Sequence, residues 1–222
     1  MHYRITGFKV KALVGTFILL NSLAAQAADS DLKVMITSEI ASLQVVHRGK
    51  KITIQRNQNP ENRIAEYLSF TSRKCPPHCI QPIKLPGIET LGELEVIEYL
   101  RRIADGDPSV LLVDTRSSEH AAKGTIPGSV NVFGDLLIPE RGANPIQVEE
   151  ILTEQFGVGG SGDDLDFRSA KTLVLFCYGI WCGQGPKTAF ALVDLGYPKG
   201  KIKWYRGGMQ DWESVGLTVV RD

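Results

Sequence analysis

The 222-residue sequence has no excess of charge of either sign, because 25 basic side chains are matched by 25 acidic ones. It contains no polybasic run and no internal repeat. These absences argue against nucleic acid as a partner and against an electrostatically bound lipid surface. The residues are 43% hydrophobic, 23% charged and 8% aromatic, an ordinary globular composition that excludes collagen-like, low-complexity and wholly disordered proteins.

Long apolar runs are also missing. The run near the start, Ala12–Leu20, is far shorter than the ~20 residues that span a bilayer. It follows three basic residues and precedes Ala25-Gln26-Ala27, an order typical of a secretory signal peptide. We therefore predict a signal peptide over residues 1–27 and a periplasmic mature chain without a membrane span. That mature chain has 22 basic and 25 acidic side chains, a net charge of −3.

Cysteine is scarce: the four cysteines form two close pairs, Cys75 with Cys79 and Cys177 with Cys182. An exported protein meets an oxidising compartment, which favours disulfides. The segment Cys75-Pro-Pro-His-Cys79 has three interpretations: a local disulfide, a soft-metal site completed by His78, or a thiol pair that exchanges sulfur or electrons with Cys177. No other histidine has the spacing of a metal ligand, so the local disulfide is the leading interpretation.

Residues 28–87 differ from the rest of the chain. Short β-type runs at Leu43–Val46 and Ile52–Ile54 flank Arg48-Gly-Lys50, which predicts a hairpin. The prolines around the first cysteine pair exclude a regular helix or a central strand there and predict an ordered connector. We interpret residues 28–87 as an N-terminal extension rather than an independent domain.

From residue 88 onward the pattern alternates between helix and strand. Val110–Val113 and Leu173–Phe176 are continuous apolar runs, as expected for strands buried on both faces. Thr90 and Glu93 fit a capping box for a following helix, and Pro186 fits the first residue of another. The order predicts an α/β fold, a mainly parallel sheet flanked by helices, over residues 88–222.

Cys177 is the candidate nucleophile. It ends an apolar strand and is followed by a glycine-containing loop that leads into a helix. Backbone N–H groups converge in such a loop, and the helix dipole adds a positive field that favours a thiolate. The alternative is a buried structural cysteine at a strand end.

The chain resembles the rhodanese-like sulfurtransferases over residues 88–222. Three segments carry the resemblance, in the order and spacing of the family: Asp114-Thr-Arg116 with Glu119 and Gly124–Ser129, the loop from Cys177 to Gly183, and Gly207-Gly-Met-Gln-Asp-Trp212 with Gly216-Leu217.

The resemblance implies a two-step transfer of sulfane sulfur without metal or cofactor. Cys177 would take sulfur from thiosulfate, a polysulfide or a persulfide and pass it to a thiol or cyanide. The partners would be a small sulfur donor and a thiol acceptor, including a periplasmic redox or sulfur-carrier protein. The amides of the loop would bind the sulfur; its residues are Tyr178, Gly179, Ile180, Trp181, Cys182 and Gly183. Trp212 is expected to pack in the core.

Two departures from the family shape the prediction. Thiosulfate-using members usually place Arg or Lys in the loop, whereas residues 178–184 have no basic side chain, which favours a less charged donor. Arg116 or Arg206 would have to supply charge from outside the loop, and Asp114 would line the pocket beside them or cap the turn after its strand. The second departure is Cys182, either a thiol that resolves oxidised Cys177 or a small apolar filler.

Two other functions stay open on the sequence alone. One is a thiol–disulfide redox protein that uses Cys177 and Cys182. The other is a non-catalytic binding or copper-handling module that uses Cys75 and Cys79.

Overall fold

The computed structural model describes residues 33–221, and residues 34–221 belong to one compact unit. The predicted signal peptide, residues 1–27, lies outside the described residues. Within the described part, no helix is long and apolar enough to cross a membrane.

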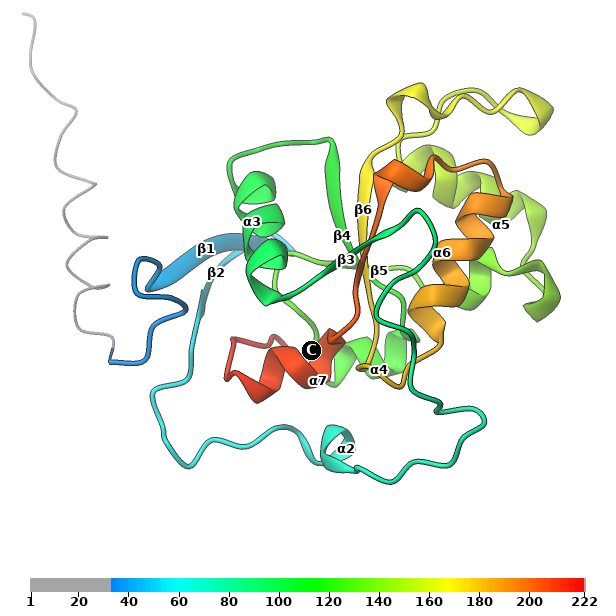
Figure 1. Ribbon diagram of the computed structural model, residues 1–222. Coiled ribbons are helices and arrows are strands. Elements are labelled where there is room, and N and C mark those ends of the chain that lie inside the picture. Colours follow the sequence, from blue (N-terminus) through cyan, green and yellow to red (C-terminus); the bar gives the residue numbers. More distant parts are fainter. Residues whose placement is uncertain (1–32, 222) are drawn as a thin grey trace, which may run out of the picture. The chain divides into compact units, whose positions relative to one another are not determined.

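A five-stranded parallel sheet forms the centre of this unit (Figure 1). The strand order β3-β7-β6-β4-β5 requires helical crossovers between neighbours, as the alternating pattern predicts. The predicted α/β fold class is confirmed. The strands are β3 (Glu89–Leu91), β4 (Val110–Asp114), β5 (Val130–Asn131), β6 (Thr172–Phe176) and β7 (Ile202–Tyr205).

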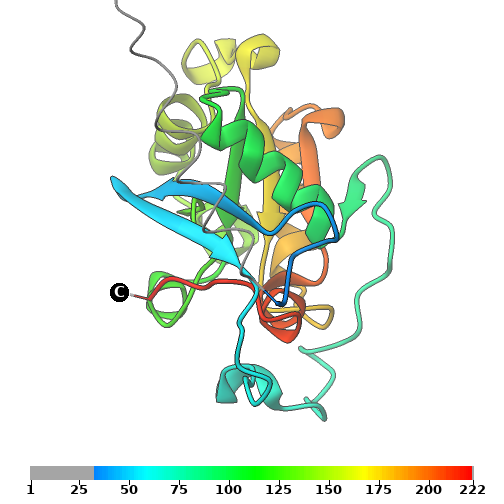
Figure 2. The same ribbon diagram turned by 90° about the vertical axis from the view of Figure 1, so that its left-hand side faces the viewer.

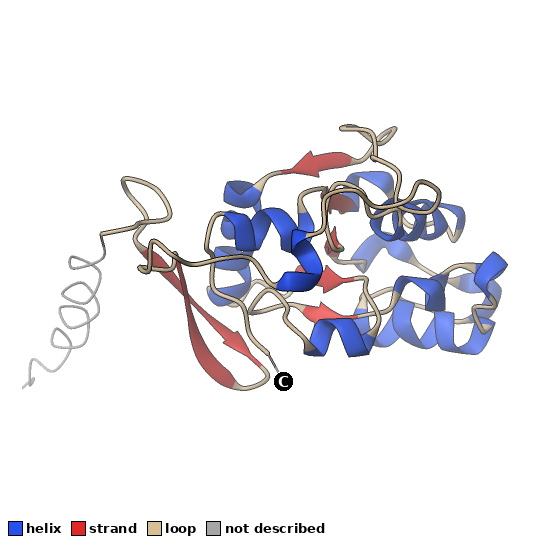
Figure 3. Ribbon diagram, turned by 90° about the horizontal axis from the view of Figure 1, so that it is seen from below, coloured by secondary structure: helices blue, strands red, loops and turns tan. Residues whose placement is uncertain are grey.

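Helices lie on both sides of the sheet (Figure 3). The side chains of α3 and α7 belong to one buried cluster and those of α5 and α6 to the other. The helices are α2 (Glu66–Ser69), α3 (Glu93–Ala104), α4 (Ser118–Ala122), α5 (Pro145–Glu150), α6 (Gln184–Asp194) and α7 (Gly208–Ser214). A π-helical turn, Ile151–Gln155, extends α5.

Strand β6 shows why its sequence is apolar throughout. Leu173 and Leu175 face the cluster with α5 and α6, while Val174 and Phe176 face the cluster with α3 and α7. All four are fully buried, because side chains alternate between two covered faces. Trp212 of α7 is fully buried in the second cluster, so the prediction of core packing is confirmed.

The predicted hairpin is also present. Strands β1 (Ser42–His47) and β2 (Lys50–Gln55) pair antiparallel around Arg48-Gly49, and both turn residues have positive φ. The hairpin packs against α3 (Figure 2). Val45 and Ile54 join Leu100 in the buried cluster. Residues before 88 therefore contribute to the same core as those after it.

Two predicted helix starts are wrong. Thr90 does not cap α3, because it belongs to β3 and pairs with Trp204; instead, the carboxylate of Glu95 accepts from the N–H of Gly92 at 3.0 Å. Helix α6 begins at Gln184, two residues before Pro186. Proline is tolerated at that third position because the first four N–H groups of a helix have no partner within the helix.

Candidate functional site

Cys177 lies directly after β6, at the carboxyl edge of the sheet, and its side chain is 3% exposed. The loop that follows leads into the first turn of α6 at Gln184. Cys182, 7% exposed, forms a disulfide with Cys177, with 6.3 Å between the two Cα atoms. The interpretation of Cys182 as a filler that never meets Cys177 is therefore wrong. Its role as a resolving thiol stays a prediction.

The N-terminus of α7 is joined to the loop by two backbone hydrogen bonds. The N–H groups of Met209 and Gln210 donate to the carbonyl oxygens of Cys177 and Tyr178, at 3.0 and 2.8 Å. Gly208 makes this approach with a φ of +55°, and a Cβ there would lie 2.4 Å from the Cys177 oxygen. Glycine is therefore required at the start of α7, which gives a physical reason for this part of the C-terminal motif.

Within the loop, the N–H of Cys182 donates to the oxygen of Gly179 at 2.9 Å. Of the six amides predicted to bind sulfur, that of Cys182 is therefore already engaged in the disulfide-bonded form. The amides at the start of α6 lie at the positive end of its dipole, so this edge of the sheet favours a negative charge.

Aromatic side chains cover the loop. The rings of Tyr178 and Trp181 stack at 5.6 Å, and His120 of α4 meets Tyr178 edge-on at 5.3 Å. The indole N–H of Trp181 donates to Oε1 of Gln210 at 3.0 Å. Burial raises the pKa of Tyr178 to about 12.

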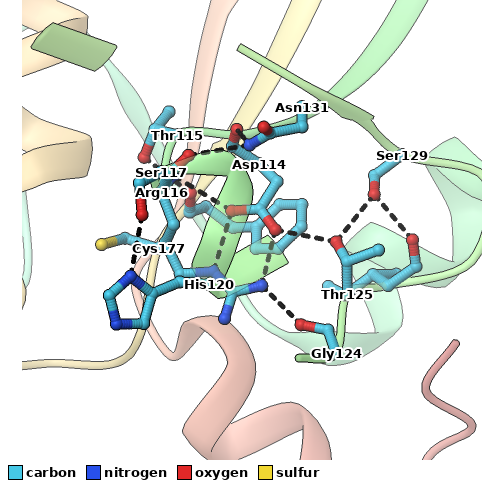
Figure 4. A network of polar contacts seen from close by, with 12 residues as sticks. Asp114, Thr115, Arg116, Ser117, His120, Gly124, Thr125, Ser129, Asn131 and Cys177 are labelled. Atoms are coloured by element: carbon cyan, nitrogen blue, oxygen red, sulfur yellow. Dashed lines mark hydrogen bonds and ion pairs between the residues drawn. The ribbon is translucent and has the colours of Figure 1, made fainter. Parts of the chain in front are cut away.

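Asp114 and Arg116 form a buried ion pair at the end of β4, beside Cys177 (Figure 4). Nε and Nη2 of Arg116 donate to the two carboxylate oxygens of Asp114 at 2.9 and 2.6 Å, and Nη2 also donates to the oxygen of Gly124. Oδ1 of Asp114 also accepts from the Arg116 N–H, the turn-capping role considered from the sequence. The charge of Arg116 is thus committed to Asp114.

Arg206 is committed elsewhere. Its guanidinium donates to the carbonyl oxygens of Gln81 and Pro82 in the connector. Neither of the two arginines considered from the sequence therefore has its charge free for a donor anion in this form.

The proline-rich connector, residues 71–87, packs against the loop from Cys177 to Gly183. The N–H of Gln81 donates to the oxygen of Ile180 at 2.9 Å. The His78 ring meets Trp181 edge-on at 5.4 Å, and the guanidinium carbon of Arg73 lies 4.1 Å from the centre of a Trp181 ring. A cavity of about 460 Å³ is lined by both segments: Thr71, Arg73, Cys75, His78, Ile80, Ile180 and Trp181.

The connector contains the second disulfide, between Cys75 and Cys79. The leading interpretation of this pair from the sequence agrees with the structure. In this form the two sulfurs are not thiolates, and within residues 33–221 no group of three or more His, Cys, Asp and Glu side chains is arranged to hold a metal ion.

Sequence reasoning missed several residues of the site. Arg73, Gln81 and His120 reach the loop only through tertiary contacts, and no local pattern marks them. Gln210 lies inside the C-terminal motif that carried the resemblance, so that motif contained a usable signal.

A family model described as the rhodanese-like domain matches residues 96–215, more than half of the chain. No match was found among curated proteins. One similar solved structure is the BH2092 protein from Bacillus halodurans, with 18% identity over 61% of this chain and 78% of that chain, at a TM-score of 0.42. Another is the human single-domain sulfurtransferase TSTD1, with 23% identity over 56% and 95% of the chains, at 0.38. A thiosulfate sulfurtransferase from Pseudomonas aeruginosa has 17% identity over 61% of this chain and 21% of that chain, also at 0.38.

Proposed function

The chain belongs to the rhodanese-like domain family, and on that premise we propose that it is a sulfurtransferase that carries sulfane sulfur as a persulfide on Cys177. The observation that supports this most is the position of Cys177, between the end of β6 and the start of α6. A thiolate there lies in the positive field of the helix N-terminus. The same field stabilises the negative outer sulfur of a persulfide.

The reaction requires the reduced form of the loop. The Cys177 thiolate attacks the sulfane sulfur of the donor, a new S–S bond forms, and the donor leaves with the electron pair of its old bond. An acceptor thiolate then attacks the outer sulfur of the persulfide, and Cys177 leaves as a thiolate. Oxidation state and charge balance in each step, so the transfer needs no redox cofactor.

The charges around the loop favour a persulfide or polysulfide over thiosulfate as donor. Residues 178–184 have no basic side chain, Asp114 neutralises Arg116, and Arg206 donates to connector carbonyls. The remaining guanidinium near the loop, that of Arg73, lies on a Trp181 ring. Thiosulfate is a compact dianion and would therefore lose its hydration without a free cation as partner, which is costly. The aromatic cover of Tyr178 and Trp181 suits a sulfur chain that has no oxyanion group.

The disulfide between Cys177 and Cys182 is the inactive, oxidised form in this proposal. Two disulfides fit an oxidising compartment, and with the signal-like N-terminus they support a periplasmic location.

Intact-mass analysis tests the proposal. The full chain is reduced, freed of reductant and exposed separately to thiosulfate and to polysulfide, and peptide mapping locates the added sulfur. We expect one sulfur atom on Cys177 with polysulfide and little with thiosulfate, and none in Cys177→Ser. Cys182→Ser should still take up sulfur, because it keeps the nucleophile. Sulfur uptake that survives in Cys177→Ser would overturn the assignment.

The disulfide also favours a second function, thiol–disulfide exchange through Cys177 and Cys182. In that case the reduced protein gains no sulfur from either donor. Instead it re-forms the Cys177–Cys182 disulfide while it reduces a disulfide substrate, and Cys182→Ser stops the turnover.

A further inference from the structure

The two disulfides differ in access. Cys177 and Cys182 are 3% and 7% exposed, whereas Cys75 is exposed and Cys79 is half-buried. Thiol–disulfide exchange requires an attacking thiolate to approach a sulfur directly. An external dithiol of protein size can therefore reach the Cys75–Cys79 disulfide but not the one in the loop.

The connector and the loop nevertheless share a boundary. The Gln81–Ile180 hydrogen bond fixes the connector to the middle of the loop, and Arg73 and His78 both contact Trp181, the neighbour of Cys182. The cavity that Cys75 lines is also lined by Ile180 and Trp181. The exposed disulfide and the loop that contains the buried disulfide therefore line the same cavity.

We propose that Cys75 and Cys79 form a redox relay that takes electrons from an external dithiol and passes them to the Cys177–Cys182 disulfide. The relay would switch the loop from its oxidised form to the reduced form that carries sulfur. Its biological purpose rests on the proposed sulfurtransferase function, but its chemistry does not.

The steps balance as two exchanges. A thiolate of the external dithiol attacks the Cys75–Cys79 disulfide, and its second thiol then closes the external disulfide, so that two electrons and two protons pass to the pair. One thiolate of the reduced pair next attacks the sulfur of Cys182, and Cys177 leaves as a thiolate. The second thiol of the pair attacks the mixed disulfide, Cys182 leaves and takes up a proton, and the Cys75–Cys79 disulfide is restored.

The geometry indicates which sulfur of the Cys177–Cys182 disulfide the reduced Cys75–Cys79 pair attacks. Cys182 adjoins Trp181, which the connector contacts, whereas Cys177 lies against the first turn of α6, where a Cβ on Gly185 would be 4.0 Å from the Cβ of Cys177. A thiolate stabilised by a helix N-terminus is a good leaving group, which favours attack on Cys182.

The order of reduction tests the relay in the unmodified chain. The oxidised protein is mixed with reduced thioredoxin, a protein dithiol, and samples are acid-quenched, alkylated with N-ethylmaleimide and mapped. At the earliest times we expect label on Cys75 and Cys79, and at later times on Cys177 and Cys182, as the Cys75–Cys79 disulfide is restored. Label that stays on Cys75 and Cys79 while Cys177 and Cys182 remain oxidised would overturn the relay, and this measurement needs no variant.

A double variant, Cys75→Ser with Cys79→Ser, should slow thioredoxin-dependent reduction of the buried disulfide about tenfold or more, because its accessible route is gone. Once chemically reduced, the same variant should take up sulfur on Cys177 like the unmodified chain. An unchanged rate of reduction would refute the relay. Absence of sulfur uptake in the unmodified chain would instead refute the proposed function, so the two failures are distinct.

Trapping of an intrachain disulfide tests whether a cysteine of the connector can reach Cys182. Cys75→Ser with Cys177→Ser leaves Cys79 and Cys182, and Cys79→Ser with Cys177→Ser leaves Cys75 and Cys182. On mild oxidation, one of these folded variants should form an intrachain disulfide. If circular dichroism shows both folded and neither forms it, the relay is wrong.

The contact with Trp181 has a matched control. Arg73→Ala removes the cation that lies over Trp181, whereas Lys74→Ala removes the same charge from the exposed neighbouring position. We expect the first to slow the transfer to Cys177–Cys182 and the second to leave it unchanged. Equal effects of the two would show that the contact plays no part.

Discussion

Replacing Arg116 by methionine removes the cation that neutralises Asp114 beside the candidate loop. Both side chains are 0% exposed, and the guanidinium makes two hydrogen bonds to the carboxylate and one to the oxygen of Gly124. Arg116→Met therefore leaves a buried carboxylate with the hydroxyl of Thr125 and a backbone N–H as its remaining donors.

The expected loss is about 3–5 kcal/mol of unfolding free energy, the usual cost of removing one partner of a buried ion pair. Domains have total stabilities of about 5–15 kcal/mol, so the loss is a large fraction of the whole. For a domain of this size each kcal/mol lowers the melting temperature by about 2–4 °C, which gives a decrease of about 6–20 °C. Urea unfolding of the oxidised protein, followed by tryptophan fluorescence, measures the free energy.

The chain contains a matched control for burial. Arg168 and Asp166 form the same bidentate pair with the same spacing, but at the surface, where Arg168 is 91% exposed. Arg168→Met should leave the unfolding free energy unchanged within error, since exposed pairs are screened by solvent. The double variant Asp114→Asn with Arg116→Met should be more stable than Arg116→Met alone, because it buries no unpaired charge. If Arg116→Met costs no more than Arg168→Met, the reasoning from burial is refuted.

Two further predictions concern the walls of the loop. Gly208→Ala should lower the free energy of unfolding by about 1 kcal/mol or more and slow sulfur uptake, because both the positive φ and the nearby Cys177 oxygen oppose a Cβ there. Gly106→Ala is the control, because Gly106 also has a positive φ but open space around it. It should lower stability without slowing sulfur uptake. Burial raises the pKa of Tyr178 to about 12 from 10.0. The unfolded chain therefore loses this proton first, and the stability that Tyr178 contributes is lost as the pH rises from 10 towards 12. Unfolding free energies measured across this range should fall less steeply in Tyr178→Phe, and identical slopes would contradict the burial of the phenol.

The strands that could be predicted from the sequence are those whose pattern is local. The apolar runs of β4 and β6 reflect burial on both faces, and the hairpin of β1 and β2 reflects its turn at Arg48-Gly49. Helix starts were harder to predict because tertiary contacts decide them. Thr90 resembles a cap, but its pairing with Trp204 extends a strand instead.

The residues of the site also fall into those that a local pattern marks and those that only tertiary contacts bring together. Cys177 and its loop were found because a strand, a glycine-containing loop and a helix follow one another in the chain. The connector was predicted to be ordered, but its place could not be predicted, because the contact of Gln81 with Ile180 joins residues almost a hundred positions apart. The same holds for Arg206, which reaches Gln81 rather than a sulfur donor.

The position of the connector changes what the N-terminal extension contributes. Leu68 is fully buried, its oxygen accepts from Gln210, and Gln210 in turn accepts from Trp181 of the loop. The extension is therefore linked to the loop by side chains as well as by the Gln81 backbone. A segment held this way restricts the access of large molecules to Cys177. Under the proposed relay, the redox control of sulfur transfer would depend on the extension, whereas the proposed transfer itself would need only the loop at the end of β6.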